Sequence, residues 1–173
     1  EGRIAMSVVN GTRLLAASPI KDMLHGKERH GGVTFGLAEV GYDVRIKQAL
    51  HFTRDKYGNK ITMVTTDGVS QRQIGWAVLV NVMEEFTMPP DLVGIGHPKS
   101  SWNRNHLRLG SPVAEPGWQG FLTISLDLRG EEELKVEAGS GIMQMIFYRL
   151  ESDAAYAGRY QNQGDQIVGS IQA

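Results

Sequence analysis

Apolar residues recur at two different spacings along this chain, and each spacing predicts a different element. Between Leu14 and Leu24 they form a loose stripe of helical period, and Gly26 follows as a stop, so the pattern predicts a helix over 12–25. From residue 76 to 86 apolar side chains occupy alternate positions on both faces. That second pattern is typical of a well-buried strand.

Shorter apolar runs separated by glycine-containing turns predict five further strands, at 42–46, 50–54, 60–65, 121–128 and 142–150. The segment Lys56–Asn59 predicts a hairpin turn, and the glycine-rich stretch 30–36 predicts a loop. The expected fold is therefore mainly β, a single distorted barrel or jelly-roll with one short N-terminal helix.

Three segments differ in character along the chain. Residues 1–5 precede Met6, and we interpret them as an added leader outside the protein proper. Residues 6–150 carry the strand patterns and are expected to form the β domain. Residues 151–173 are polar and rich in Gln and Gly, a composition that resembles disorder when taken alone.

Charge and cysteine content narrow the classes of function. The net charge of −1 over 173 residues leaves no basic excess for nonspecific nucleic-acid binding, so neither nucleic acid nor a membrane is an expected partner. With no cysteine, disulfides and thiolate metal sites are excluded. No apolar run approaches the roughly 20 residues of a membrane span, and cytoplasm is the default compartment.

The segment Lys99–Arg104 combines two cations with two hydroxyls in six residues, a composition suited to binding phosphate. Taken alone, such a short motif is more often a capped helix that faces solvent. Its neighbours in the sequence favour the phosphate-binding interpretation. Five motifs occur in order, namely Gly41–Arg45, Met88–Gly94, Lys99–Arg104, Glu115–Gly120 and Arg159–Gln163.

This order of motifs resembles the dCTP deaminase/dUTPase superfamily, and its deaminase branch in particular. The resemblance implies a dUTPase-like β-clip fold and a homotrimer with active sites at the subunit interfaces. It also implies a pyrimidine deoxynucleoside triphosphate substrate, with Mg²⁺ carried on the phosphates and no direct protein ligand. Residues 151–173 would then be a lid that closes over the nucleotide.

The resemblance assigns roles to individual residues. The expected catalytic group is Glu115, Asp43, Ser100 and Arg104, and the expected substrate-binding group is Lys99, Ser101, Trp118, Tyr160 and Gln163. Lys99 stands where arginine is usual in the family, which weakens a bidentate phosphate contact. Each of these residues also has a structural reading: Asp43 as a strand-end carboxylate, Glu115 as a turn residue and Trp118 as a core anchor.

Two departures from the family pattern bear on the reaction. Deamination requires a group that moves protons, and the family's glutamate for this task falls at Ser125 in this chain. Asp127, two residues on, would be a poor replacement at about 7 Å along the strand. Glu115 stands where aspartate is usual, which keeps the carboxylate but displaces it by one methylene.

The sequence therefore favours dUTP diphosphatase activity, in which Glu115 activates water and Asp43 organises water or metal. Arg104 and Lys99 would stabilise charge on the phosphates. The alternative is deamination of dCTP to dUTP or dUMP with release of ammonia. A second alternative is a nucleotide-binding homologue that has lost catalysis.

Overall fold

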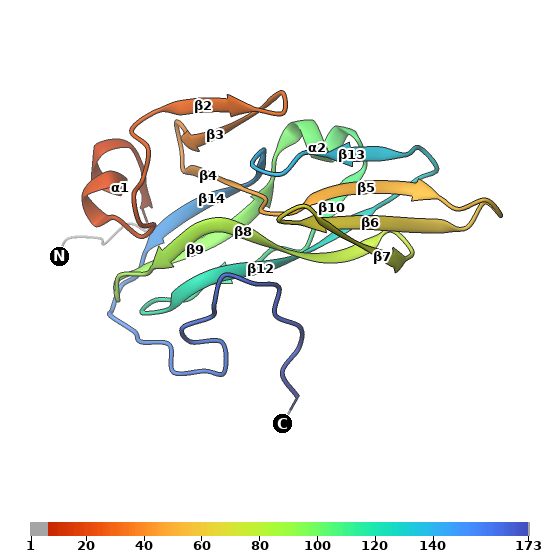
Figure 1. The fold of residues 1–173 in the computed structure, drawn as a ribbon. Helices are drawn as coiled ribbons and strands as arrows, with labels where there is room; N and C mark the ends of the chain where they lie inside the picture. The colour runs from red at the N-terminus through yellow and green to blue at the C-terminus, as the bar shows by residue number, and fades with distance from the viewer. Residues whose placement is uncertain (1–6, 173) are drawn as a thin grey trace.

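The computed structural model describes residues 7–172, and within them the chain is mainly β with two short helices. The predicted leader 1–5 lies outside the described residues. Figure 1 shows helix α1 (Gly11–Ala17) beside the end of the sheets and helix α2 (Ser100–Arg104) near their middle.

The strands form three sheets. The seven-stranded sheet has the order β11 (Val113–Ala114), β9 (Leu92–Pro98), β14 (Gly141–Arg149), β4 (Tyr42–Arg45), β3 (Val33–Leu37) and β2 (Lys27–His30), with β1 (Val8–Val9) also on β14. The three-stranded sheet is β10 (Leu107–Leu109), β12 (Gln119–Leu128) and β8 (Ala77–Thr87). The four-stranded sheet is β13 (Leu134–Val136), β5 (Ala49–Arg54), β6 (Lys60–Thr66) and β7 (Val69–Ile74).

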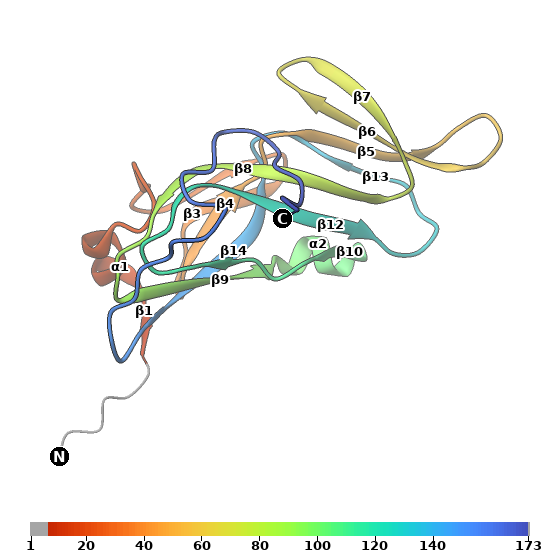
Figure 2. The same cartoon turned by 90° about the horizontal axis from the view of Figure 1, so that it is seen from below.

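The hydrophobic core joins the three sheets. Val44 and Phe147 from the seven-stranded sheet, Val80 and Ile124 from the three-stranded sheet, and Phe52 from the four-stranded sheet belong to one buried cluster. Figure 2 shows the β8–β12 pair above β9 and β14, with the β6–β7 hairpin extending away from them. Among residues 7–172 no sheet closes on itself, so the expected barrel is corrected to an arrangement of three open sheets.

The strands expected at 42–46, 50–54, 60–65, 76–86, 121–128 and 142–150 are all present, with bounds shifted by up to two residues. The hairpin turn at Lys56–Asn59 is also confirmed. There the Asp55 carboxylate accepts the backbone N–H groups of Tyr57 and Asn59, both at 2.9 Å. Alternation of apolar residues was a sufficient signal for these elements because each buries one face or both.

Two expectations near the N-terminus are wrong. The helix expected over 12–25 ends at Ala17, because Ser18 adopts a left-handed conformation (φ 47°) and Pro19 follows it. The loop expected over 30–36 is instead part of the β2–β3 hairpin, whose turn is Gly31–Gly32 with φ of 57° and 77°. Glycine permits both of those backbone conformations without a steric penalty.

Residues 151–172, which we call the tail, carry no helix or strand, yet they lie against the body of the protein. Gln163 forms a parallel bridge with Gly120 on β12. Farther on, the Asp165 carboxylate accepts a hydrogen bond from the Asn81 amide at 2.9 Å and pairs with the Lys47 ammonium at 2.7 Å. The tail is therefore held on β8 and β12 by specific polar contacts.

Candidate functional site

The residues expected to form one site lie around two separate cavities of the single chain. Glu115, Trp118, Tyr160 and Gln163 line a cavity of about 510 Å³, which we call the aromatic cavity. Asp43, Lys99, Ser100 and Ser101 line a second cavity of about 530 Å³, which we call the polar cavity. Arg104 lines neither of them.

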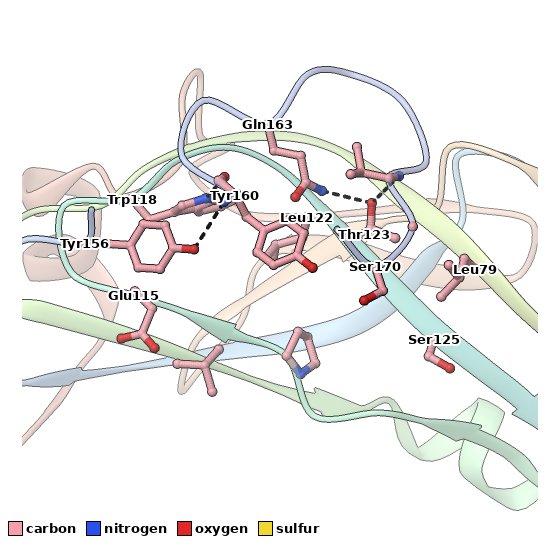
Figure 3. A pocket seen from close by; sticks show the side chains of 14 residues that line it. Leu79, Glu115, Trp118, Leu122, Thr123, Ser125, Tyr156, Tyr160, Gln163 and Ser170 are labelled. Atoms are coloured by element: carbon pink, nitrogen blue, oxygen red, sulfur yellow. Dashed lines mark hydrogen bonds between the residues drawn. The ribbon is translucent and has the colours of Figure 1, made fainter. Parts of the chain in front are cut away.

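The aromatic cavity lies between β12 and the tail (Figure 3). Its β-sheet side carries Leu122, Thr123 and Ser125 from β12, and Leu79 from β8 directly opposite Ser125. The remaining lining includes Tyr156, Tyr160, Val168 and Ser170 from the tail. Such a cavity, largely apolar with a few hydroxyl and amide groups, is typical of a site for a small organic ligand.

Trp118 anchors the tail rather than standing free in the cavity. Its side chain is buried, and its indole N–H donates to the Tyr160 carbonyl at 2.6 Å. The ring also packs against Phe86, with 5.9 Å between ring centroids. Gly117 precedes it with φ of 74°, a conformation that glycine adopts without strain. Trp118 can therefore present only part of its ring to a ligand.

Tyr160 and Gln163 also contact the chain itself. The Gln163 amide donates to the Phe121 carbonyl and to the Thr123 hydroxyl, both at 2.9 Å, and the Phe121 N–H donates to the Gln163 carbonyl at 3.0 Å. The Tyr160 hydroxyl accepts the Ile171 N–H at 3.1 Å. These contacts place both residues on the cavity wall, as expected for a ligand-binding segment.

Glu115 is the one carboxylate among the described residues that line the aromatic cavity. It is exposed at the Glu115–Trp118 turn, where its carbonyl accepts the Trp118 N–H at 3.1 Å. In Figure 3 Glu115 lies near Tyr156, whereas Ser125 lies near Leu79 at the other end. The cavity therefore offers a carboxylate at one end and a hydroxyl at the other.

Asp127 does not replace the missing carboxylate at Ser125. It lies outside the cavity lining, and its carboxylate pairs with the Arg129 guanidinium at 2.6 Å. Pairing of β12 with β8 is regular from Thr123 to Asp127, because the one register shift falls before Thr123. No shift in the described β12–β8 register therefore brings Asp127 into the position of Ser125.

The polar cavity is built on a buried ion pair between β4 and the segment just before α2. The Lys99 ammonium donates to Oδ2 of Asp43, and the side chains are 12% and 5% exposed. Oδ1 of Asp43 is buried without a hydrogen-bond partner in the described structure. Burial raises the pKa of Asp43, and the hydrogen bond and charge of Lys99 oppose that rise.

Helix α2 sets the direction of the hydroxyl motif. Trp102 fixes the helix in place, because its ring is buried and its indole N–H donates to the Gly141 carbonyl at 2.7 Å. Ser100 and Ser101 remain exposed and line the polar cavity. Arg104 is exposed in the last turn and lies outside the cavity lining. The two interpretations of the Lys99–Arg104 motif thus each hold in part. Its serines line a cavity, and its arginine is exposed outside that cavity.

Sequence reasoning missed several residues of both cavities. Lys27, Arg29 and Gln144 line the polar cavity, and Tyr156 and Thr123 line the aromatic one. The period-2 spacing of Lys27 and Arg29 could have placed them on one face of a strand, had 27–30 been assigned as one. Gln144 was expected within a strand, but its position opposite Asp43 depends on the pairing of β14 with β4.

Two kinds of site are not found among residues 7–172. No group of three or more His, Asp or Glu side chains there could hold a metal ion. None of the helices in that range is long and apolar enough to cross a membrane.

Comparisons with known proteins agree with the family resemblance of the sequence. A family model described as dCTP deaminase-like matches residues 35–150. The dCTP deaminase of Herpetosiphon aurantiacus is 28% identical over 158 residues, which cover 83% of this chain and 86% of the relative.

Among the solved structures compared, one aligns with a TM-score of 0.54 and supports the same fold. The 2′-deoxycytidine 5′-triphosphate deaminase of Agrobacterium tumefaciens aligns with a TM-score of 0.54 and 16% identity over 83% of this chain and 48% of its own. The dUTPase of Staphylococcus bacteriophage 80alpha aligns with a TM-score of 0.48 and 12% identity over 90% of this chain and 97% of its own. Because the family model spans more than half of the chain, the protein belongs to the dCTP deaminase-like family.

Proposed function

We propose that this protein is an enzyme acting on a pyrimidine deoxynucleoside triphosphate, with dCTP as the substrate and dUTP and ammonia as the products. The sequence alone favoured hydrolysis of dUTP, but the relative named dCTP deaminase and the matching family model support the alternative better. The single structural observation that carries the proposal is the aromatic cavity, which joins Trp118, Tyr160 and Gln163 to one carboxylate, Glu115.

The base and sugar bind in the aromatic cavity in this proposal. Its apolar lining suits a planar ring, and the side-chain oxygens of Thr123 and Ser125 offer hydrogen-bonding partners along β12. Water adds to C4 of cytosine, and the amine leaves as ammonia after protonation. Glu115 is the group that moves those protons, because Ser125 cannot do so near neutral pH and Asp127 is paired with Arg129.

The triphosphate binds in the polar cavity, beside the hydroxyls of Ser100 and Ser101. Mg²⁺ carried on the phosphates would neutralise their charge, and Asp43 fits beside it because its Oδ1 has no other partner. The two cavities have no residue in common. In the homotrimer that the family resemblance implies, we propose that the aromatic cavity of one subunit lies beside the polar cavity of another. The compartment we propose is the default one, the cytoplasm.

Hydrolysis of dUTP to dUMP and diphosphate is the second candidate. It is favoured by one observation: Ser125 leaves the position of the family's proton-transferring glutamate without a carboxylate, and hydrolysis requires only a carboxylate that activates water for attack on the phosphate. Glu115 would fill that role.

The test is to incubate the purified protein and Mg²⁺ with dCTP and dUTP separately and to resolve the products by anion-exchange chromatography. dUTP formed from dCTP, with ammonia in equal amount, is the expected result. dUMP from dUTP with dCTP untouched would overturn deamination in favour of the second candidate. Binding of both nucleotides without any product would leave a nucleotide-binding protein.

A further inference from the structure

The positive charge around the polar cavity is largely neutralised by the chain's own carboxylates. Three cations line the cavity: Lys27, Arg29 and Lys99. The Lys99 ammonium is paired with Asp43, and the Lys27 ammonium contacts both oxygens of Glu39 at 2.6 Å. An ion pair of this kind has little net charge left to attract an anion.

Arg29 is the exception. Its Nη1 donates to the Gly32 carbonyl at 3.2 Å, and among the described residues its guanidinium forms no salt bridge. A guanidinium carries five N–H groups, so this contact leaves donors available for another acceptor. Arg29 is also exposed, which makes it accessible to a ligand entering the cavity.

The strand register directs Arg29 toward the phosphate motif. Arg29 on β2 lies directly opposite Thr34 on β3, so both side chains leave the same face of the sheet. Thr34 in turn lies 3.4 Å from the Lys99 ammonium, between its hydroxyl oxygen and Nζ. Ser100 and Ser101, which follow Lys99 in the sequence, line the same cavity.

Neither cation of the Lys99–Arg104 motif can supply an unpaired positive charge to the polar cavity of its own chain. Lys99 is neutralised by Asp43, and Arg104 lies outside the cavity lining. Planar guanidinium groups bind phosphate oxygens in pairs, which a neutralised ammonium does not reproduce. The cavity therefore has one uncompensated phosphate-binding cation, and it comes from the β2–β3 hairpin rather than from the motif.

We infer that Arg29 is a substrate-binding residue that contacts the triphosphate, together with the hydroxyls of Ser100 and Ser101. This inference rests on the proposed function, because it takes the polar cavity as the phosphate end of the nucleotide site. The ligand class it requires is a polyphosphate, whatever base the nucleotide carries.

The test measures binding of inorganic tripolyphosphate, dCTP and deoxycytidine by isothermal titration calorimetry. Arg29→Gln should weaken binding of tripolyphosphate and dCTP by about tenfold and leave deoxycytidine unaffected, because only the first two carry phosphate. Arg29→Lys should recover part of the loss. Arg13→Gln, which removes a cation on α1 away from the polar cavity, is the matched control and should change nothing.

The outcomes separate this inference from the proposed function. Equal tripolyphosphate and dCTP affinities for wild type and Arg29→Gln would overturn the role of Arg29, even if dCTP is still converted. A purely structural role predicts instead a lower melting temperature and an equal loss for deoxycytidine. Tripolyphosphate binding that depends on Arg29, without any reaction of dCTP or dUTP, would refute the proposed function and support the anion site. Failure of the wild type to bind tripolyphosphate and dCTP would refute both.

Discussion

Glu115 and Ser125 line the same cavity but offer different chemistry. A carboxylate can accept and return a proton near neutral pH, whereas a serine hydroxyl needs a partner to do so. Asp127, the nearest carboxylate along β12, is already paired with Arg129. Whichever reaction the protein performs, the structure leaves Glu115 as the carboxylate of the aromatic cavity.

Glu115→Gln is therefore expected to lower kcat by about two orders of magnitude or more with little change in nucleotide affinity. Steady-state rates and a binding titration measure the two effects separately. Glu132→Gln, an exposed carboxylate on the connection between β12 and β13, serves as the control and should keep the wild-type rate. Full activity of Glu115→Gln would refute the assigned role.

Ser125→Glu is expected to raise the rate of ammonia release from dCTP. It restores a proton-transferring group on the outward face of β12, opposite Leu79, where the cavity has space and no competing cation. A coupled ammonia assay measures the change, and Ser125→Gln, of nearly equal size but unable to exchange protons, is the control. An equal gain from both variants would mean that side-chain size, not proton transfer, limits the reaction.

Glu84 supplies a prediction of pH dependence. The carboxylate is buried and accepts two hydrogen bonds from Arg45, one from Nε at 2.8 Å and one from the backbone N–H at 2.9 Å. Burial raises the pKa of Glu84 above 4.5, and Arg45 opposes the rise without reversing it. The folded state thus binds a proton that the unfolded state has released, so this group lowers stability as pH rises from 4.5 toward its raised pKa.

Urea denaturation at several pH values measures this contribution. In Glu84→Gln the free energy of unfolding should fall less steeply with pH in that window than in wild type. Glu85→Gln, whose side chain forms an exposed pair with Lys21, should retain the wild-type slope. Parallel curves for Glu84→Gln and wild type would contradict the assignment.

At the scale of elements, the tail supplies residues that line the aromatic cavity, and the β2–β3 hairpin supplies residues that line the polar cavity. Both were difficult to assign from the sequence, for different reasons. The tail has a composition typical of disorder, and its position on β12 depends on contacts such as Gln163 to Thr123, 40 residues apart. The hairpin was obscured by its glycines, which serve as a tight turn. By contrast, alternation of buried residues predicted the long strands well.

Asp165 is expected to hold the tail in place. Its partner Asn81 is held in position, because the Asn81 amide oxygen accepts a hydrogen bond from the buried Gln48 amide at 2.6 Å. That bond directs the N–H groups of Asn81 toward the Asp165 carboxylate. Asp165→Ala should therefore increase hydrogen exchange of the backbone amides in 160–170, measured by mass spectrometry. Asp153→Ala, exposed at the start of the tail, should have no such effect. Unchanged exchange in Asp165→Ala would contradict this role.

At the scale of the whole molecule, the separation of the two cavities is the main feature that the sequence did not reveal. The motifs Gly41–Arg45 and Lys99–Arg104 meet in the polar cavity, and Glu115–Gly120 and Arg159–Gln163 meet in the aromatic cavity. Motif order indicates that the residues belong to one family, but it carries no information on which motifs share a subunit's cavity. The pairing of β14 with β4 and of the tail with β12 decides that grouping.

The most direct test of the account mixes two inactive variants. Glu115→Gln damages only the aromatic cavity, and Asp43→Asn damages only the polar cavity. If each site joins the two cavities of different subunits, an equal mixture that has exchanged subunits contains intact sites. Random assembly makes about one site in four intact, so roughly a quarter of the wild-type activity toward dCTP should return. Folding and subunit exchange are checked by circular dichroism and native mass spectrometry. Mixed oligomers that regain no activity would contradict the shared site.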